Sequence, residues 1–234
     1  THETEDAIIA ETDPEAKVAS IGPAGENKVR FASVINDKHR SAGRSGVGAV
    51  MGSKNLKAVA VRGTVGLKPA DKEAFRAECL RLIKLVSGHP AALGMRAKGT
   101  TNGVNIANKF GVYPTRNSQS GVFEHYQEIG PEKMHKTVFV RARACAGCPV
   151  ACKRVTQLNT EKYKGVGEGP EYETLYSFGG MTGVSDIYAI TKANYLCNEL
   201  GLDTISAGAT IACAMEMFEK GFISEEQVGR SLTF

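Results

Sequence analysis

Apolar residues recur at strand-like spacing in the first third of the chain and at helical spacing after it. In the first third, short β-rich runs are separated by glycine-rich turns, and these runs are residues 17–21, 29–35 and 56–61. Farther along, apolar stripes and helix-end signals predict helices at residues 71–87, 91–97, 185–200 and 205–221. The pattern therefore predicts an α+β protein in which a sheet is followed by a mostly α-helical part.

The character of the sequence changes in the segment from Gly63 to Pro69, which predicts a boundary between residues 1–65 and residues 66–234. Immediately after this segment, Asp71 is placed to cap the first long helix. One face of that helix is apolar and is expected to pack against the protein; it consists of Phe75, Cys79, Leu82 and Val86.

The composition is that of a folded globular protein, with 42% hydrophobic and 23% charged residues. A net charge of +4 is too small to indicate nucleic-acid binding, and no apolar run is long enough to span a membrane. The chain has neither an initiator methionine nor a secretory segment at its start, so we expect a piece of a longer cytoplasmic protein. Six cysteines without a signal peptide favour reduced thiols and metal chemistry. Three of them lie on apolar helical stripes and are expected to be small buried hydrophobes: Cys79, Cys197 and Cys213.

The densest chemical signal is a C-x2-C-x3-C run that places Cys145, Cys148 and Cys152 within eight residues. Thiolates bind iron–sulfur clusters and zinc, and the glycine and proline inside the run favour a tight loop. A zinc site usually offers a second Cys/His pair at short spacing, which this sequence lacks. The spacing therefore favours an iron–sulfur cluster over zinc, a redox dithiol or a structural coincidence. Three thiolates are one short of the four ligands of a cubane cluster.

A second signal is the glycine-rich segment that begins with Arg40, Ser41, Gly43 and Arg44. Its backbone can approach an anion closely, and its arginines can pair with phosphate oxygens. The segment matches neither a Walker loop nor a dinucleotide-binding fingerprint. A tight connection that binds nothing is the alternative interpretation.

The remaining candidate functional residues are carboxylates at two places in the chain. Asp203 follows Gly201 between two predicted helices, where it can cap the second helix or accept N–H groups of a heterocycle. Glu171 and Glu173 precede an apolar run, and a carboxylate in such surroundings can act as a base or proton relay. For at least one of the two, a solvated loop charge is the alternative. The five histidines show no pairing pattern and receive no catalytic role.

Taken together, these stretches resemble the tungsten-containing aldehyde ferredoxin oxidoreductase family. Four motifs stand in the same order from about residue 5 to residue 230: R-x-x-G-R ahead of GAVMGSKNLK, C-x-G-C-P-V-x-C-K-R, G-P-E-Y-E-T and G-L-D-T-I-S-A-G. The resemblance implies that residues 1–65 are the C-terminal part of a β-rich pterin-binding domain. It implies that residues 66–234 are most of a helical domain that carries the cluster loop, with the last helical domain absent.

The resemblance also implies a bis-molybdopterin cofactor that holds tungsten or molybdenum, beside a [4Fe–4S] cluster. By motif match, pterin-binding positions fall on Arg40, Ser41, Gly43, Arg44, Asn198, Leu202 and Asp203, and three cluster-ligand positions fall on Cys145, Cys148 and Cys152. The family pattern has aspartate where this chain has Asn198, and an amide accepts at one oxygen where a carboxylate accepts at two. Asn198 is thus expected to hold a pterin N–H edge less well. The fourth cluster cysteine is expected outside this chain, and Lys153 with Arg154 is expected to tune the cluster potential.

The implied reaction is oxidation of a small aldehyde to a carboxylic acid, with ferredoxin as the electron acceptor and Glu171 or Glu173 as the proton relay. The first alternative keeps these cofactors and changes the substrate, through aromatic thioester reduction or sugar-phosphate aldehyde oxidation. The remoter alternative is a non-enzymatic metal-binding or electron-transfer module built on the cysteine loop. Members of the family are often dimers, so a homodimer is a further expectation.

Overall fold

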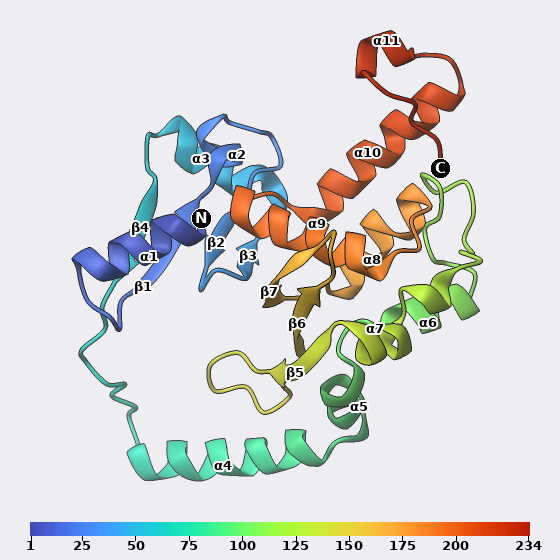
Figure 1. The fold of residues 1–234 in the computed structure, drawn as a ribbon. Helices are drawn as coiled ribbons and strands as arrows, with labels where there is room; N and C mark the ends of the chain where they lie inside the picture. The colour runs from blue at the N-terminus through green and yellow to red at the C-terminus, as the bar shows by residue number, and fades with distance from the viewer.

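The computed structural model describes residues 1–234, and its N-terminal part is built on a four-stranded antiparallel sheet (Figure 1). The strand order is β3 (Arg40–Ala42), β2 (Val34–Asn36), β1 (Lys17–Ile21) and β4 (Ala58–Val61). In register, Ser20 of β1 pairs with Ile35 on one side and with Ala58 on the other. Three helices surround this sheet: α1 (His2–Glu11), α2 (Pro23–Glu26) and α3 (Val47–Ser53).

Helix α3 lies inside the glycine-rich segment, where the sequence indicated only a loop. The helix forms there because its glycines let it pack directly on a neighbouring backbone. A Cβ atom added at Gly52 would lie 1.9 Å from the carbonyl oxygen of Gly25 in α2, which leaves no room for any side chain. Helix α3, which directly follows the residue 40–46 segment, therefore packs on α2 at backbone contact.

Replacing Gly52 with alanine is expected to destabilise the protein, because the new methyl group must push α3 away from α2. Overpacking of this kind costs about 2 kcal/mol, which in a protein several times the size of a small domain corresponds to a fall of about 2 °C in Tm. Differential scanning calorimetry of the full-length protein measures this change. Gly63→Ala is the matched control, since a Cβ at Gly63 meets nothing within 4 Å. Equal Tm values for the two variants would contradict the close packing of α2 and α3.

The second part of the chain is mostly helical and carries a small three-stranded sheet (Figure 1). Its core contains apolar residues from several helices and from the connection between α6 and α7, with Tyr113, Phe123 and Leu175 fully buried. The antiparallel strands run in the order β5 (Phe139–Arg143), β6 (Lys153–Asn159) and β7 (Lys164–Glu168). The helices are α4 (Lys72–Gly88), α5 (Pro90–Lys98), α6 (Asn102–Lys109), α7 (Pro131–Thr137), α8 (Tyr172–Phe178), α9 (Ile187–Leu200), α10 (Thr204–Glu219) and α11 (Glu225–Val228). The α+β class and the predicted long helices are confirmed.

The sequence patterns do not predict the three-stranded sheet, and strand β7 is the hardest of its strands to recognise because its residues look like a polar, glycine-rich connection. The ring of Tyr195 on α9 covers this strand, and a Cβ at Gly167 would lie 2.6 Å from the ring. The tyrosine hydroxyl donates to the carbonyl oxygen of Thr156 in β6, at 2.8 Å. The apolar side chain that packs on the strand thus comes from a helix almost thirty residues away along the chain, so no local sequence pattern indicates the strand.

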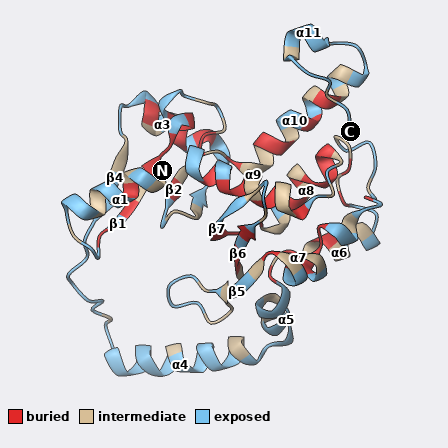
Figure 2. Cartoon of the chain, in the orientation of Figure 1, coloured by how far each residue is buried: buried red, intermediate tan, exposed pale blue.

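Two burial predictions are wrong. Helix α4 begins at the Asp71 cap as predicted, with Ala74 N donating to Asp71 at 2.9 Å, but none of its residues is buried (Figure 2). Its apolar face stays uncovered in this chain, and Phe75 is 50% exposed. Among the three helical cysteines, Cys197 is buried, whereas Cys79 is partly exposed and Cys213 is exposed. Burial raises the pKa of the Cys197 thiol to about 12.

The two parts of the chain meet where the segment before β2 reaches the α9–α10 corner. Ser33 N donates to the carbonyl oxygen of Gly201 at 2.8 Å, and Asp203 N donates to that of Phe31 at 3.1 Å. Ala32 and Leu202 form an isolated antiparallel bridge between these contacts. This main-chain clasp places the corner beside the glycine-rich segment (Figure 1). None of the helices is long and apolar enough to cross a membrane.

Candidate functional site

A cleft of about 300 Å³ lies at this junction and is lined almost wholly by polar residues. Leu202 and Ile205 are the apolar residues in its wall. The wall contains most of the candidate residues outside the cysteine run: Ser41, Gly43, Arg44, Glu171, Glu173, Asn198, Leu202 and Asp203. These residues come from β3, from η1 (the 3-10 turn Arg44–Gly46), from the start of α8 and from the α9–α10 corner. The tertiary structure thus brings three distant motifs to one surface.

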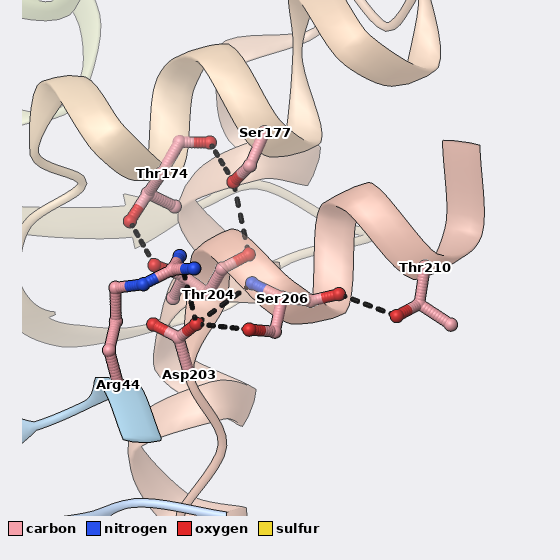
Figure 3. Close-up of polar contacts among 7 residues, drawn as sticks. All are labelled: Arg44, Thr174, Ser177, Asp203, Thr204, Ser206 and Thr210. Atoms are coloured by element: carbon pink, nitrogen blue, oxygen red, sulfur yellow. Dashed lines mark hydrogen bonds and ion pairs between the residues drawn. The ribbon is translucent and has the colours of Figure 1, made fainter. Parts of the chain in front are cut away.

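Asp203 is the anchored carboxylate of the cleft (Figure 3). Its Oδ2 accepts hydrogen bonds from Ser206 N at 2.9 Å and from Ser206 Oγ at 2.6 Å, so it caps α10. Arg44 Nη1 approaches the same oxygen at 3.7 Å, although the Arg44 side chain is 62% exposed and the Asp203 side chain only 6%. Arg44 therefore keeps N–H groups free to bind a second anion in the cleft.

Contacts between α8 and α10 fix the side of the cleft that carries Glu173 and Asp203 (Figure 3). Thr174 Oγ1 donates to Thr204 Oγ1 at 3.0 Å, and Ser177 Oγ donates to the carbonyl oxygen of Thr204 at 3.0 Å. These side chains tie both turns of α8 to the start of α10. The α8 turn that carries Glu173 is therefore fixed relative to Asp203.

Gly43 lies where the glycine-rich segment passes closest to Asp203. A Cβ at this position would lie 3.1 Å from Asp203 Oδ1 and 3.3 Å from Ser41 Oγ. The absence of a side chain lets the backbone approach the carboxylate, and the N–H groups of such a backbone are available to an anionic ligand.

The two candidate glutamates occupy different environments. Thr100 Oγ1 donates to Glu171 Oε2, and the same hydroxyl accepts Tyr172 N at 3.1 Å, so Glu171 is held at the start of α8. Burial and then the Glu171 charge raise the pKa of Cys152, which places this carboxylate toward the cysteine loop. Glu173 is exposed in the cleft beside Tyr176. Burial and then Glu173 raise the pKa of Tyr176 to about 12.

The three predicted cluster ligands lie on the loop between β5 and β6. Cys148 N donates to the carbonyl oxygen of Cys145 at 3.1 Å, which forms a tight turn. Cys145 and Cys148 are exposed, and Cys152 is partly exposed. No group of three His, Cys, Asp or Glu side chains is close enough together to hold a metal ion in this structure. The three thiols share one short loop and present their sulfur atoms near the surface.

Arg154, which follows this loop, is buried and anchors it rather than facing solvent. Its guanidinium donates to the carbonyl oxygens of Ala97 at 2.9 Å, Arg96 at 2.8 Å and Ala151 at 2.8 Å. Its charge also lies 5.1 Å from the centre of the Phe139 ring. Of the basic pair that the sequence singled out, Lys153 is the one that lines the cleft.

Arg40 lies between the cleft and the cysteine loop instead of lining the cleft. Its Nη1 is 3.7 Å from Cys145 Sγ, and its Nη2 is 3.1 Å from a carboxylate oxygen of Glu168. Sequence reasoning missed Glu168, since a charge in a glycine-rich run is normally solvated. It also missed His39, which lines the cleft. Burial lowers the pKa of His39 to about 4, so the imidazole is neutral at pH 7.

Comparison with known proteins identifies the chain. Residues 1–63 match the family described as "Aldehyde ferredoxin oxidoreductase, N-terminal domain", and residues 79–234 match "Aldehyde ferredoxin oxidoreductase, domains 2 & 3". The chain belongs to the aldehyde ferredoxin oxidoreductase family.

Relatives within and near this oxidoreductase family support the assignment. The chain is 48% identical over 99% of its length to the tungsten-containing aldehyde ferredoxin oxidoreductase of Thermococcus kodakarensis. It is 47% identical over the same share to the enzyme of that name from Pyrococcus furiosus. In both cases it spans 38% of the relative. Among solved structures, it resembles the active-site complex BamBC of benzoyl coenzyme A reductase with 1,5-dienoyl-CoA. The TM-score is 0.77 at 28% identity, over 96% of this chain and 36% of that chain.

The residues of the cleft fit an anionic, hydrogen-bonding cofactor such as the pterin that the sequence resemblance implies. Arg44 and Lys153 supply positive charge, and Gly43 supplies a close backbone approach. His39 Nδ1 is buried without a hydrogen-bond partner and lines the cleft, whereas the Glu168 carboxylate, also in the wall, is paired with Arg40 and Arg143. Buried polar atoms without partners are rare in proteins, and His39 Nδ1 can form a hydrogen bond with a ligand in the cleft. The adjacent loop supplies three thiols, which suit an iron–sulfur cluster.

Proposed function

We propose that this chain is the cofactor-binding part of an oxidoreductase that oxidises aldehydes to carboxylic acids with ferredoxin as the electron acceptor. Residues 1–65 are the C-terminal part of its β-rich pterin-binding domain, and residues 66–234 are the helical domain with the cluster loop. The observation that carries this proposal is the convergence of the glycine-rich segment, the Glu171–Glu173 turn and the Asp203 corner on one cleft beside the cysteine loop.

In this proposal the cofactors are a bis-molybdopterin with tungsten or molybdenum and a [4Fe–4S] cluster, which supply two-electron oxidation and one-electron transfer. Arg44 and the backbone around Gly43 bind the anionic part of the pterin, and the Asp203 carboxylate accepts its N–H groups. The cluster thiolates come from the loop between β5 and β6, and they are Cys145, Cys148 and Cys152. The remaining cluster ligand comes from outside residues 1–234.

The two glutamates have separate roles in this proposal. Glu173 is exposed in the cleft, so its carboxylate can take a proton from water or substrate and release it to solvent. Glu171 accepts the Thr100 hydroxyl hydrogen bond, so it is engaged in holding the start of α8. Asn198 also lines the cleft, where its amide can both donate and accept.

Metal analysis combined with an activity assay tests the proposed function. Full-length protein purified without oxygen is expected to contain tungsten or molybdenum together with iron, and to reduce ferredoxin only when an aldehyde is added. Zinc as the single bound metal, without aldehyde-dependent reduction, would refute the proposal and support a non-enzymatic metal-binding module.

A second candidate keeps the cofactors and changes the substrate to an aromatic thioester. The likeness to the benzoyl coenzyme A reductase complex favours it, whereas the higher identity to the aldehyde enzymes favours the first candidate. A panel of aldehydes, sugar-phosphate aldehydes and aromatic thioesters, assayed with the full-length protein, distinguishes them. Turnover of the thioesters alone would replace the first candidate with the second.

A further inference from the structure

The Glu168 carboxylate lies buried between two arginines that come from different parts of the fold. Arg40 of β3 approaches Oε2 at 3.1 Å, and Arg143 of β5 approaches Oε1 at 2.7 Å. The Glu168 side chain is only 4% exposed, whereas Arg143 is 45% exposed and shares its charge with solvent. One carboxylate therefore joins the N-terminal sheet to the strand that leads into the cysteine loop.

The position of this carboxylate is set by the backbone of β7. Glu168 pairs with Val155 in the sheet, and its carbonyl oxygen accepts Asn194 Nδ2 from α9 at 2.8 Å. The carboxylate oxygens themselves accept no well-directed hydrogen bond, so charge attraction to the two guanidinium groups dominates. A buried charge without its partners is strongly unfavourable, and the same holds for a half-buried guanidinium left without its anion.

Arg40 extends the contact from Glu168 to the cysteine loop. Its Nη1 is 3.7 Å from Cys145 Sγ, and its Nη2 is 3.5 Å from the carbonyl oxygen of Ala144. All hydrogen bonds and ion pairs between residues 40–44 and the loop of residues 144–152 go through this one side chain. The orientation of Arg40 thus decides how the glycine-rich segment and the loop sit relative to each other.

We propose that Glu168 is a positioning residue that fixes Arg40, and through it the spacing between the glycine-rich segment and the cysteine loop. The proposal rests on the proposed function for its purpose, since these segments would hold the pterin and the cluster. The contact itself belongs to this chain alone and needs no bound cofactor.

Hydrogen exchange of the metal-free, full-length protein tests the positioning role. In Glu168→Gln, backbone amides of residues 39–46 and of residues 144–152 are expected to exchange about tenfold faster, because both segments lose their shared anchor. Amides of α9 are expected to keep their wild-type rates. Glu128→Gln is the matched control, because it removes an exposed ion pair with Lys133 at 2.6 Å and is expected to change neither segment.

Two further variants separate positioning from general stability. Glu168→Asp keeps the charge and is expected to restore most of the protection in both segments. In an Arg40→Gln background, Glu168→Gln is expected to raise the exchange rates of residues 144–152 only slightly further, because the side chain that connects Glu168 to the loop is already missing. Wild-type rates in Glu168→Gln, or faster exchange confined to β5–β7, or additive effects in the double variant, would each overturn the proposal. Metal analysis is independent of these rates, so a failure of the proposed function and a failure of the positioning role are separate results.

Discussion

Glu173→Gln is expected to lower kcat for aldehyde oxidation by about 10²–10⁴-fold, the usual range for loss of a general base. The glutamine fills nearly the same space but cannot take a proton, and Glu173 is the glutamate exposed in the cleft. The Asp203 cap, Arg44 and the α8–α10 contacts do not involve this side chain. Steady-state rates of ferredoxin reduction, with tungsten and iron content measured on the same samples, check the prediction.

Glu171→Gln is the matched control for this effect, since it is two residues away and lines the same cleft. An amide oxygen can still accept the Thr100 hydroxyl, so the start of α8 is expected to keep its geometry. We expect kcat to change by less than about tenfold. A large loss in Glu171→Gln with a small loss in Glu173→Gln would reverse the assigned roles.

Cys148→Ser is expected to remove most of the cluster iron from the full-length protein. Cys148 lies exposed at the turn of the cysteine loop, and serine replaces a soft thiolate with a hydroxyl that is a poor ligand for this type of cluster. Iron content and the visible absorption of the cluster are expected to fall together, and ferredoxin reduction is expected to be lost. Because the loop is anchored by Arg154, the surrounding fold is expected to remain intact.

Cys213→Ser provides the control, because it removes another exposed thiol, this one on α10. Iron content and activity are expected to stay at the wild-type level in this variant. Full iron content in Cys148→Ser, with unchanged visible absorption, would show that this thiol is not a cluster ligand and would overturn the proposed ligand set.

The sequence predicted the elements whose signals are local. Helices α9 and α10 end and begin at Gly201 and Asp203, where a residue with positive φ and a capping carboxylate act within a few positions. Helix α4 likewise begins at Asp71. The candidate residues of the cleft were found for the same reason, since short motifs carry their chemistry in consecutive positions.

The sequence failed where a distant residue supplies the environment. Strand β7 has no apolar alternation of its own, since the apolar group on it is the ring of Tyr195 from α9. Helix α3 packs on α2 through the close backbone contact of Gly52 with Gly25. Burial of the α4 face was predicted from periodicity, but periodicity identifies an apolar face and not the surface that covers it.

The sequence by itself determined the α+β class, the family resemblance and the identities of the chemical groups. Only the tertiary structure decided which of those groups meet. The main-chain clasp between Ser33 and Gly201 brings Arg44 to Asp203, although 159 positions separate the latter two in the chain. The buried environments of His39 and Glu168 also exist only in the folded chain. Charge pairing, burial and pKa depend on distances through space, and the order of residues fixes those distances only after the whole chain has folded.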